Sequence, residues 1–178
     1  NASFGAIVKG KYLYVTNFAS NSISIADISN ASSSTVVATS TLPASSGPYG
    51  IFAMGNLVYI TENTSGKLRI LDVSDPLKPQ TTATITLGGA PSNLAISGNY
   101  AYIPIGTTVK IVDISDPYNP FVVNTISGFT TAIVRYSQGF LYISDYVVST
   151  GQVKIYDVSN SASPTLKSTI SNLDGPYI

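Results

Sequence analysis

A repeat with a period of just over forty residues constrains this chain more than any other feature. The word Asp-Ile/Val-Ser occurs four times, beginning at Asp27, Asp72, Asp113 and Asp157. A word that begins with tyrosine precedes each copy, at Tyr14, Tyr59, Tyr102 and Tyr142. The aspartates are 45, 41 and 44 residues apart, and the tyrosines are 45, 43 and 40 apart. Because two independent markers keep one period, the chain contains four copies of one structural unit.

Each copy has the residue pattern of short β-strands. Segments such as 68–70 and 109–111 read apolar-polar-apolar, which is typical of a strand with one buried face. Each unit offers four such segments, separated by Gly, Asn, Ser and Pro, and none has a sustained helical period. Four strands in about forty residues are the mark of a propeller blade, which buries its faces by stacking on other blades. The sequence predicts an all-β fold of four-stranded antiparallel blades, at approximately 1–45, 46–88, 89–128 and 129–174.

The ends of the chain lie in phase with the repeat. Residues 175–177 read Gly-Pro-Tyr and repeat residues 47–49, so 175–178 are expected to open a further blade. We expect the four blades to be part of a larger propeller, with an unpaired edge that favours self-association. A closed four-bladed ring is the alternative.

Two repeat families resemble this pattern. Residues 111–117 with Pro120, and 70–76 with Pro79, resemble the LVIVD repeat. Residues 14–17, 36–39 and 47–51 together resemble the YVTN repeat. Both resemblances imply a β-propeller of the kind found in surface proteins of bacteria and archaea. The first and fourth units depart from the Asp-Pro form, with Asn30 and Asn160 at the second aspartate.

Composition excludes several classes of partner and site. Nine basic and nine acidic residues cancel, so the chain has no basic patch for nucleic acid. No apolar run approaches the roughly 20 residues that span a bilayer. Cysteine is absent, which excludes disulfides, and 25 Ser with 18 Thr supply the polar surface. The glycosylation triplets at Asn1, Asn30 and Asn63 are as many as chance predicts.

Histidine is also absent, and this restricts the chemistry further. Ser-His-Asp and Cys-His nucleophiles and His/Cys zinc sites cannot be built from this chain. No phosphate-binding loop, dinucleotide fingerprint or EF-hand spacing occurs. We expect no cofactor, with Ca²⁺ as the alternative.

Most of the nine carboxylates belong to the repeat. Asp27, Asp72, Asp113 and Asp157 close the third strand of each unit, and we expect them to accept backbone N–H bonds in the following turn. Asp75 and Asp116 precede prolines and are expected to begin Asx-type turns. We therefore interpret all six as structural.

A smaller set of residues is predicted to bind a ligand. Asn17, Glu62 and Asp145 come directly after the second strand of their units, at the end where the connectors between blades lie. With Tyr49 and Tyr146 they would form a rim that suits Ca²⁺ or a sugar. A solvated loop is the alternative, and an acid/base pair of Glu62 and Asp145 is a further one.

Arg135 is the other candidate. It replaces apolar residues on the first strand, which lines the channel of a propeller, so it would bind an anion there. Hydrogen bonds to neighbouring carbonyls are the alternative.

These observations favour a non-catalytic module on a cell surface or in the extracellular space. It would bind a protein or a glycan, or act as a scaffold. A propeller enzyme, such as a lactonase or a glycan-cleaving enzyme with metal or carboxylate chemistry on the loop face, is one alternative. A building block of a virion or surface layer is another.

Overall fold

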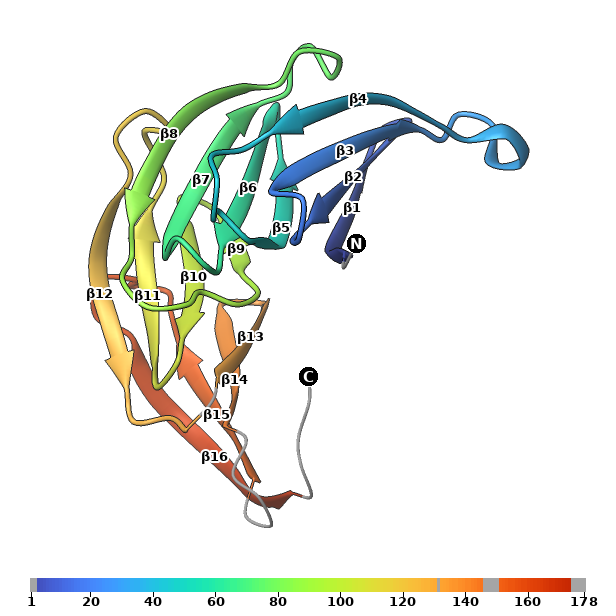
Figure 1. The fold of residues 1–178 in the computed structure, drawn as a ribbon. Coiled ribbons are helices and arrows are strands. Elements are labelled where there is room, and N and C mark those ends of the chain that lie inside the picture. The colour runs from blue at the N-terminus through green and yellow to red at the C-terminus, as the bar shows by residue number, and fades with distance from the viewer. Residues whose placement is uncertain (1–2, 131, 146–150, 174–178) are drawn as a thin grey trace. The chain divides into compact units, whose positions relative to one another are not determined.

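A computed structural model describes residues 3–130, 132–145 and 151–173 and shows four antiparallel sheets of four strands each (Figure 1). The predicted fold class, an all-β chain of four-stranded propeller blades, is confirmed. The chain divides into two units, residues 1–91 and 92–178, which are described separately. Among the described residues, no helix has the length and hydropathy that a membrane span requires.

The first unit contains two sheets. The first sheet consists of β1 (Ser3–Lys9), β2 (Tyr12–Asn17), β3 (Ser22–Asp27) and β4 (Thr35–Thr41), with the 3₁₀ turn η1 (Ala31–Ser33) between the last two strands. The second consists of β5 (Pro48–Met54), β6 (Leu57–Glu62), β7 (Lys67–Asp72) and β8 (Gln80–Thr86). Each strand pairs with the next one in the chain, so both sheets are simple meanders.

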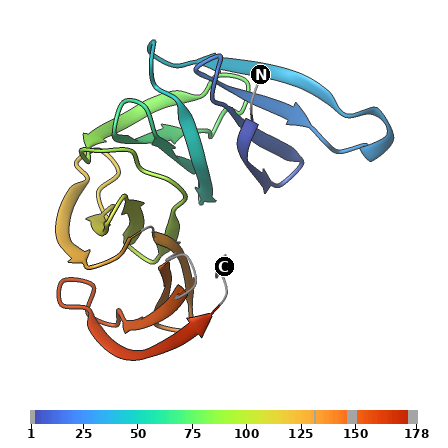
Figure 2. The same cartoon turned by 60° about the horizontal axis from the view of Figure 1, so that its bottom comes forward.

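The second unit repeats this plan. Its sheets consist of β9 (Ala95–Ser97), β10 (Tyr100–Ile105), β11 (Thr108–Asp113) and β12 (Phe121–Ser127), and of β13 (Ala132–Ser137), β14 (Phe140–Asp145), β15 (Gly151–Asp157) and β16 (Thr165–Leu173). In all four sheets the ladder between the third and fourth strands shifts register after the third strand's Ile, at Ile25, Ile70, Ile111 and Ile155. Such an irregularity increases local twist, and Figure 2 shows the twist of each sheet.

An apolar core lies between the two sheets of each unit. In the first unit, Tyr14 and Ile25 of the first sheet pack with Val58 and Ile60 of the second. In the second unit, Tyr102 and Ile111 pack with residues such as Leu141. Strands β6 and β10 are buried along most of their length, while the outer strands β4, β8, β12 and β16 are largely exposed.

A buried threonine fixes the packing of the sheets in the first unit. The Thr16 hydroxyl accepts a hydrogen bond from the Gly5 N–H and donates one to the Tyr49 carbonyl oxygen, both at 2.9 Å. A Cβ atom on Gly5 would lie 2.6 Å from that carbonyl oxygen, so only glycine permits β1 and β5 to approach this closely. This contact positions Tyr49 at the connector end of the first unit.

Candidate functional site

The predicted binding residue Glu62 ends β6, where its side chain is 1% exposed. Its Oε1 atom accepts a hydrogen bond from Arg69 Nε, and its Oε2 atom accepts one from the Ser65 hydroxyl at 2.7 Å. Arg69 Nη1 continues the network to the Thr81 hydroxyl at 3.1 Å. Glu62 thereby links the end of the second strand to the third strand of its sheet.

Asp145 occupies the same position at the end of β14 and is 5% exposed. Its Oδ1 atom accepts a hydrogen bond from the Thr130 N–H at 2.6 Å, and its Oδ2 atom lies 3.8 Å from Lys154 Nζ. The Lys154 ammonium also donates to the Gly128 carbonyl at 2.7 Å and lies 4.8 Å from the centroid of the Phe129 ring. Asp145 thus pairs with a base on the third strand, as Glu62 does.

Asn17 forms a neutral version of the same contact. Its Nδ2 atom donates to the Ser24 hydroxyl at 2.8 Å and to the Ser22 hydroxyl at 3.3 Å. Ser24 stands where the second and fourth sheets have Arg69 and Lys154, so an amide faces a hydroxyl where an acid faces a base. Asn17 and Glu62 lie in the first unit and Asp145 in the second. A ligand role for these three residues stays a prediction.

The repeated aspartates close the turns that follow the third strands. The Oδ1 atoms of Asp27, Asp72, Asp113 and Asp157 each accept a hydrogen bond, at 2.7–2.9 Å, from the N–H of the serine two residues later. Bonds from the backbone and hydroxyl of that serine hold the pKa of Asp72 and Asp157 below the usual carboxyl value. In Asp27 the hydroxyl of Ser29 is the largest cause of the same pKa shift. The turns after Asp27, Asp72 and Asp157 are therefore stabilised by an ionised carboxylate.

Arg135 lies on β13, the edge strand of its sheet, and its side chain is exposed. Its Nη1 atom donates to the Val134 carbonyl oxygen at 2.9 Å. This contact uses one of the five guanidinium N–H donors. Anion binding by Arg135 stays a prediction.

Three aromatic side chains form a cluster at the connector end of the first unit. The rings of Phe4 and Tyr49 stack with centroids 4.6 Å apart and 18° between their planes, and Phe18 meets Phe4 edge-on at 5.2 Å. Phe4 is 51% exposed, so one ring of the cluster is open to solvent. We name Phe4, Phe18 and Tyr49 the aromatic platform. It offers a flat apolar surface with one hydroxyl, a surface suited to the ring of a small polar molecule.

The sequence patterns singled out Tyr49 but missed Phe4 and Phe18. Phe18 directly follows the predicted residue Asn17, and this adjacency was the signal that could have drawn attention to it. Phe4 stands on the first strand, far from any repeated word. Tyr146, the other predicted rim tyrosine, and residues 175–178 lie outside the described residues. Within the described ranges, no three carboxylates gather in a group that could hold a metal ion.

Proteins of known structure share this fold across nearly the whole chain. A candidate 6-phosphogluconolactonase from Bacteroides uniformis matches 98% of the chain and 56% of its own length, with a TM-score of 0.83 and 15% identity. A periplasmic gluconolactonase from Pseudomonas aeruginosa matches 98% and 55%, with a TM-score of 0.83 and 14% identity. Kuenenia stuttgartiensis hydrazine synthase matches 95% and 49%, with a TM-score of 0.76 and 16% identity. The chain spans about half the length of these proteins.

These likenesses correct one expectation drawn from the sequence. The low content of catalytic side chains led us to expect that the chain is not an enzyme, and that prediction is wrong, because structures of the same fold carry the names of lactonases. The absence of histidine excludes particular nucleophiles but does not exclude hydrolysis as a class. At 14–16% identity the likeness itself shows the fold alone.

The sequence comparisons are more specific. No protein of curated function matches the chain in sequence. The model of the LVIVD repeat matches four times, over residues 5–41, 49–85, 88–127 and 134–172, and each match covers one of the four sheets. The resemblance to this repeat is confirmed, and the chain belongs to the LVIVD repeat family.

Proposed function

We propose that the protein is a propeller enzyme that hydrolyses the lactone of a sugar acid and works outside the cytoplasm. The observation that carries the proposal is the shared fold, over 98% of the chain, with two proteins named as lactonases. One of them is named as periplasmic, which supports the location. Hydrazine synthase shares the fold as well, so the fold does not identify the substrate class. The aromatic platform supports a lactone of a sugar acid as the substrate.

Lactone hydrolysis is compatible with a chain that lacks histidine. Water adds to the carbonyl carbon, the bond to the ring oxygen breaks, and that oxygen takes a proton to give a hydroxy acid. Lactones of sugar acids undergo this reaction in water without a catalyst. A protein that holds the ring and donates a hydrogen bond to the developing oxyanion can therefore accelerate it without a covalent nucleophile.

The aromatic platform suits the ring of such a substrate. The exposed face of Phe4 can pack against the C–H groups of a sugar ring, while the Tyr49 hydroxyl can donate a hydrogen bond at the ring's polar edge. The Thr16 hydroxyl bond to the Tyr49 carbonyl fixes the backbone of this residue. The platform is thus held in place before a ligand arrives.

A pH-stat assay of glucono-δ-lactone hydrolysis tests the proposal. We expect the chain to release acid faster than the uncatalysed reaction, and Phe4→Ala to raise KM roughly fivefold to tenfold through loss of ring stacking. Phe121→Ala is the matched control, because Phe121 is a similarly exposed ring (55%) on an outer strand of the other unit. A rate equal to the uncatalysed one, or equal effects of the two substitutions, would contradict the proposal.

Arg135 provides a separate prediction about anion binding. An exposed guanidinium can bind a phosphate through paired N–H donors. We expect Arg135→Ala to weaken the binding of inorganic phosphate, measured by titration calorimetry, by roughly tenfold. Lys78→Ala removes an exposed positive charge from the first unit and should leave this binding unchanged. Phosphate binding that is equal in the two variants would show that the Arg135 side chain is not an anion site.

A further inference from the structure

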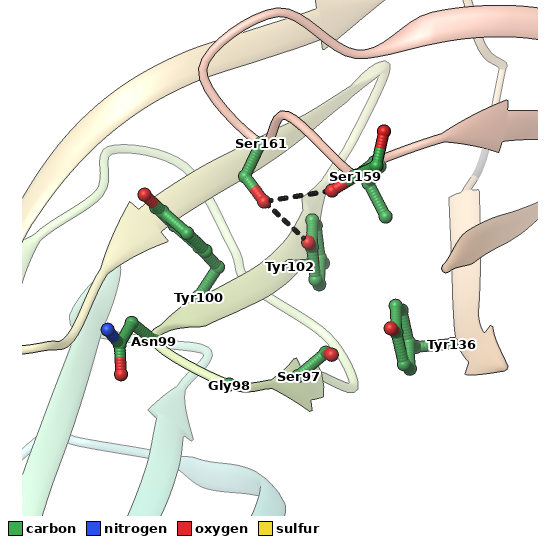
Figure 3. A pocket seen from close by; sticks show the side chains of 9 residues that line it. Ser97, Gly98, Asn99, Tyr100, Tyr102, Tyr136, Ser159 and Ser161 are labelled. Atoms are coloured by element: carbon green, nitrogen blue, oxygen red, sulfur yellow. Dashed lines mark hydrogen bonds between the residues drawn. The ribbon is translucent and has the colours of Figure 1, made fainter. Parts of the chain in front are cut away.

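A polar cavity lies in the second unit, at the opposite strand ends from Asp145. Its volume is about 300 Å³, and it opens between the β9–β10 turn and the connection from β15 to β16 (Figure 3). The polar and aromatic side chains of its lining include Asn99, Tyr100, Tyr102, Tyr136, Ser159 and Ser161. We name this cavity the tyrosine pocket. Its volume is at the lower end of the range for small-molecule sites, which suits one six-membered ring.

A chain of hydrogen bonds fixes the polar atoms of the tyrosine pocket. The Ser161 hydroxyl donates to the Val158 carbonyl oxygen at 3.2 Å, and it lies 3.0 Å from the Tyr102 hydroxyl. When the single proton of Ser161 is used on Val158, Tyr102 donates to Ser161. Burial raises the pKa of Tyr102, which keeps the phenol protonated for this bond. Tyr102 is only 1% exposed, so its part in the pocket is to hold Ser161 in place.

Two tyrosine rings supply flat apolar walls. The rings of Tyr102 and Tyr136 are parallel to within 6°, with centroids 6.2 Å apart, and Figure 3 shows both edge-on. The Tyr136 hydroxyl accepts a bond from the Gly139 N–H at 3.1 Å, which orients its ring. Every lining residue is Ser, Gly, Asn, Tyr or Val, so the walls carry no charged side chain. Aromatic faces combined with hydroxyl and amide groups suit a neutral polyhydroxylated ring better than an ion.

The first unit shows that this arrangement is not a requirement of the repeat. There, Tyr14 stands at the position of Tyr102. Pro76 stands at the position of Ser161, because each lies four residues after the repeated aspartate of its sheet. Proline has no side-chain hydroxyl, and the Tyr14 hydroxyl is buried without a hydrogen-bond partner. Ala53 stands at the position of Tyr136. The blades of the first unit pack without the serine and without the second tyrosine, so both side chains are particular to the second unit.

We propose that the tyrosine pocket binds one neutral hexopyranose ring, separately from the lactone site proposed above. The C–H face of the sugar would lie against the Tyr136 ring, and its hydroxyls would bond to the exposed Ser159 and Asn99. The inference rests on the pocket's own chemistry and does not depend on lactonase activity.

Saturation-transfer NMR with D-glucose, D-galactose and D-mannose tests this inference on the whole chain. We expect at least one sugar to bind with millimolar affinity. Tyr136→Leu keeps apolar volume but removes the ring, and Ser161→Ala removes the anchoring hydroxyl; each should weaken binding about threefold to tenfold. Tyr14→Phe is the matched control, because it removes a tyrosine hydroxyl that has no partner, and it should leave binding unchanged.

The same experiment distinguishes a glycan end from a free sugar as the ligand. A methyl glycoside that binds as well as the free sugar identifies the end residue of a glycan, whereas loss of binding on methylation identifies the free sugar; both support the pocket. The absence of saturation transfer from all three sugars at about 50 mM overturns the inference. Binding that survives both Tyr136→Leu and Ser161→Ala also overturns it. Lactone hydrolysis should be unaffected by either substitution, so failure of this inference leaves the proposed activity untouched.

Discussion

At the scale of single residues, two departures from the repeat compensate each other. Asn17 replaces an acid at the end of the second strand, and Ser24 replaces a base on the third strand. Their hydrogen bond occupies the place of the Glu62–Arg69 ion pair. Three of the four sheets therefore carry a matched pair at this position, charged in two and neutral in one, whereas the third sheet has Ile105 and Lys110 there.

This interpretation predicts how the second sheet responds to substitution. Glu62→Ala leaves Arg69 buried without its carboxylate and should lower the free energy of unfolding by about 3–5 kcal/mol. The double variant Glu62→Asn with Arg69→Ser copies the neutral pair of the first sheet and should recover most of that loss. Urea unfolding of the three proteins measures both effects. A loss below about 1 kcal/mol in Glu62→Ala, or no recovery in the double variant, would refute the matched pair.

At the scale of elements, the strands and turns were predictable because the same hydrogen-bonding solution recurs in every copy. The alternating segments around 68–70 and 109–111 are strands β7 and β11, and the repeated aspartates close the turns behind the third strands. A search for repeats finds what the four units share. The aromatic platform and the tyrosine pocket consist of residues in which the units differ, such as Phe4, Tyr136 and Ser161, so the periodic pattern gave no indication of them.

The turns make stability depend on acidity. The pKa values of Asp27, Asp72, Asp116 and Asp157 are lowered in the folded chain, so their stabilisation is complete above the unfolded value of about 3.9 and is lost as pH falls through the lowered values. We expect the thermal midpoint to fall as the pH drops below about 4.

A substitution in one turn isolates the contribution of its carboxylate. Asp72→Asn should lower the midpoint at pH 7, because an amide oxygen accepts the Ser74 N–H bond less strongly, but should flatten the decline in acid, because an amide does not titrate. Thermal unfolding followed by circular dichroism between pH 7 and pH 2 measures both slopes. A decline in Asp72→Asn as steep as in the unsubstituted chain would show that this turn does not contribute.

At the scale of the whole molecule, family membership and fold are established, whereas the activity is proposed. The four LVIVD matches coincide with the four sheets. The same repeats leave the strand ends free to vary. The expectation that the chain is not an enzyme is corrected by its likeness in fold to proteins named as lactonases, and lactone hydrolysis requires neither histidine nor cysteine.

Amide NMR with the lactam analogue of gluconolactone, which binds as the substrate would but does not hydrolyse, tests the proposed lactone site. We predict shift changes that titrate together at the amides of Phe4, Phe18 and Tyr49 and disappear in Phe4→Ala, with no change in Phe121→Ala. Saturable binding that leaves these three amides unmoved, or no binding at all, would refute the proposed function.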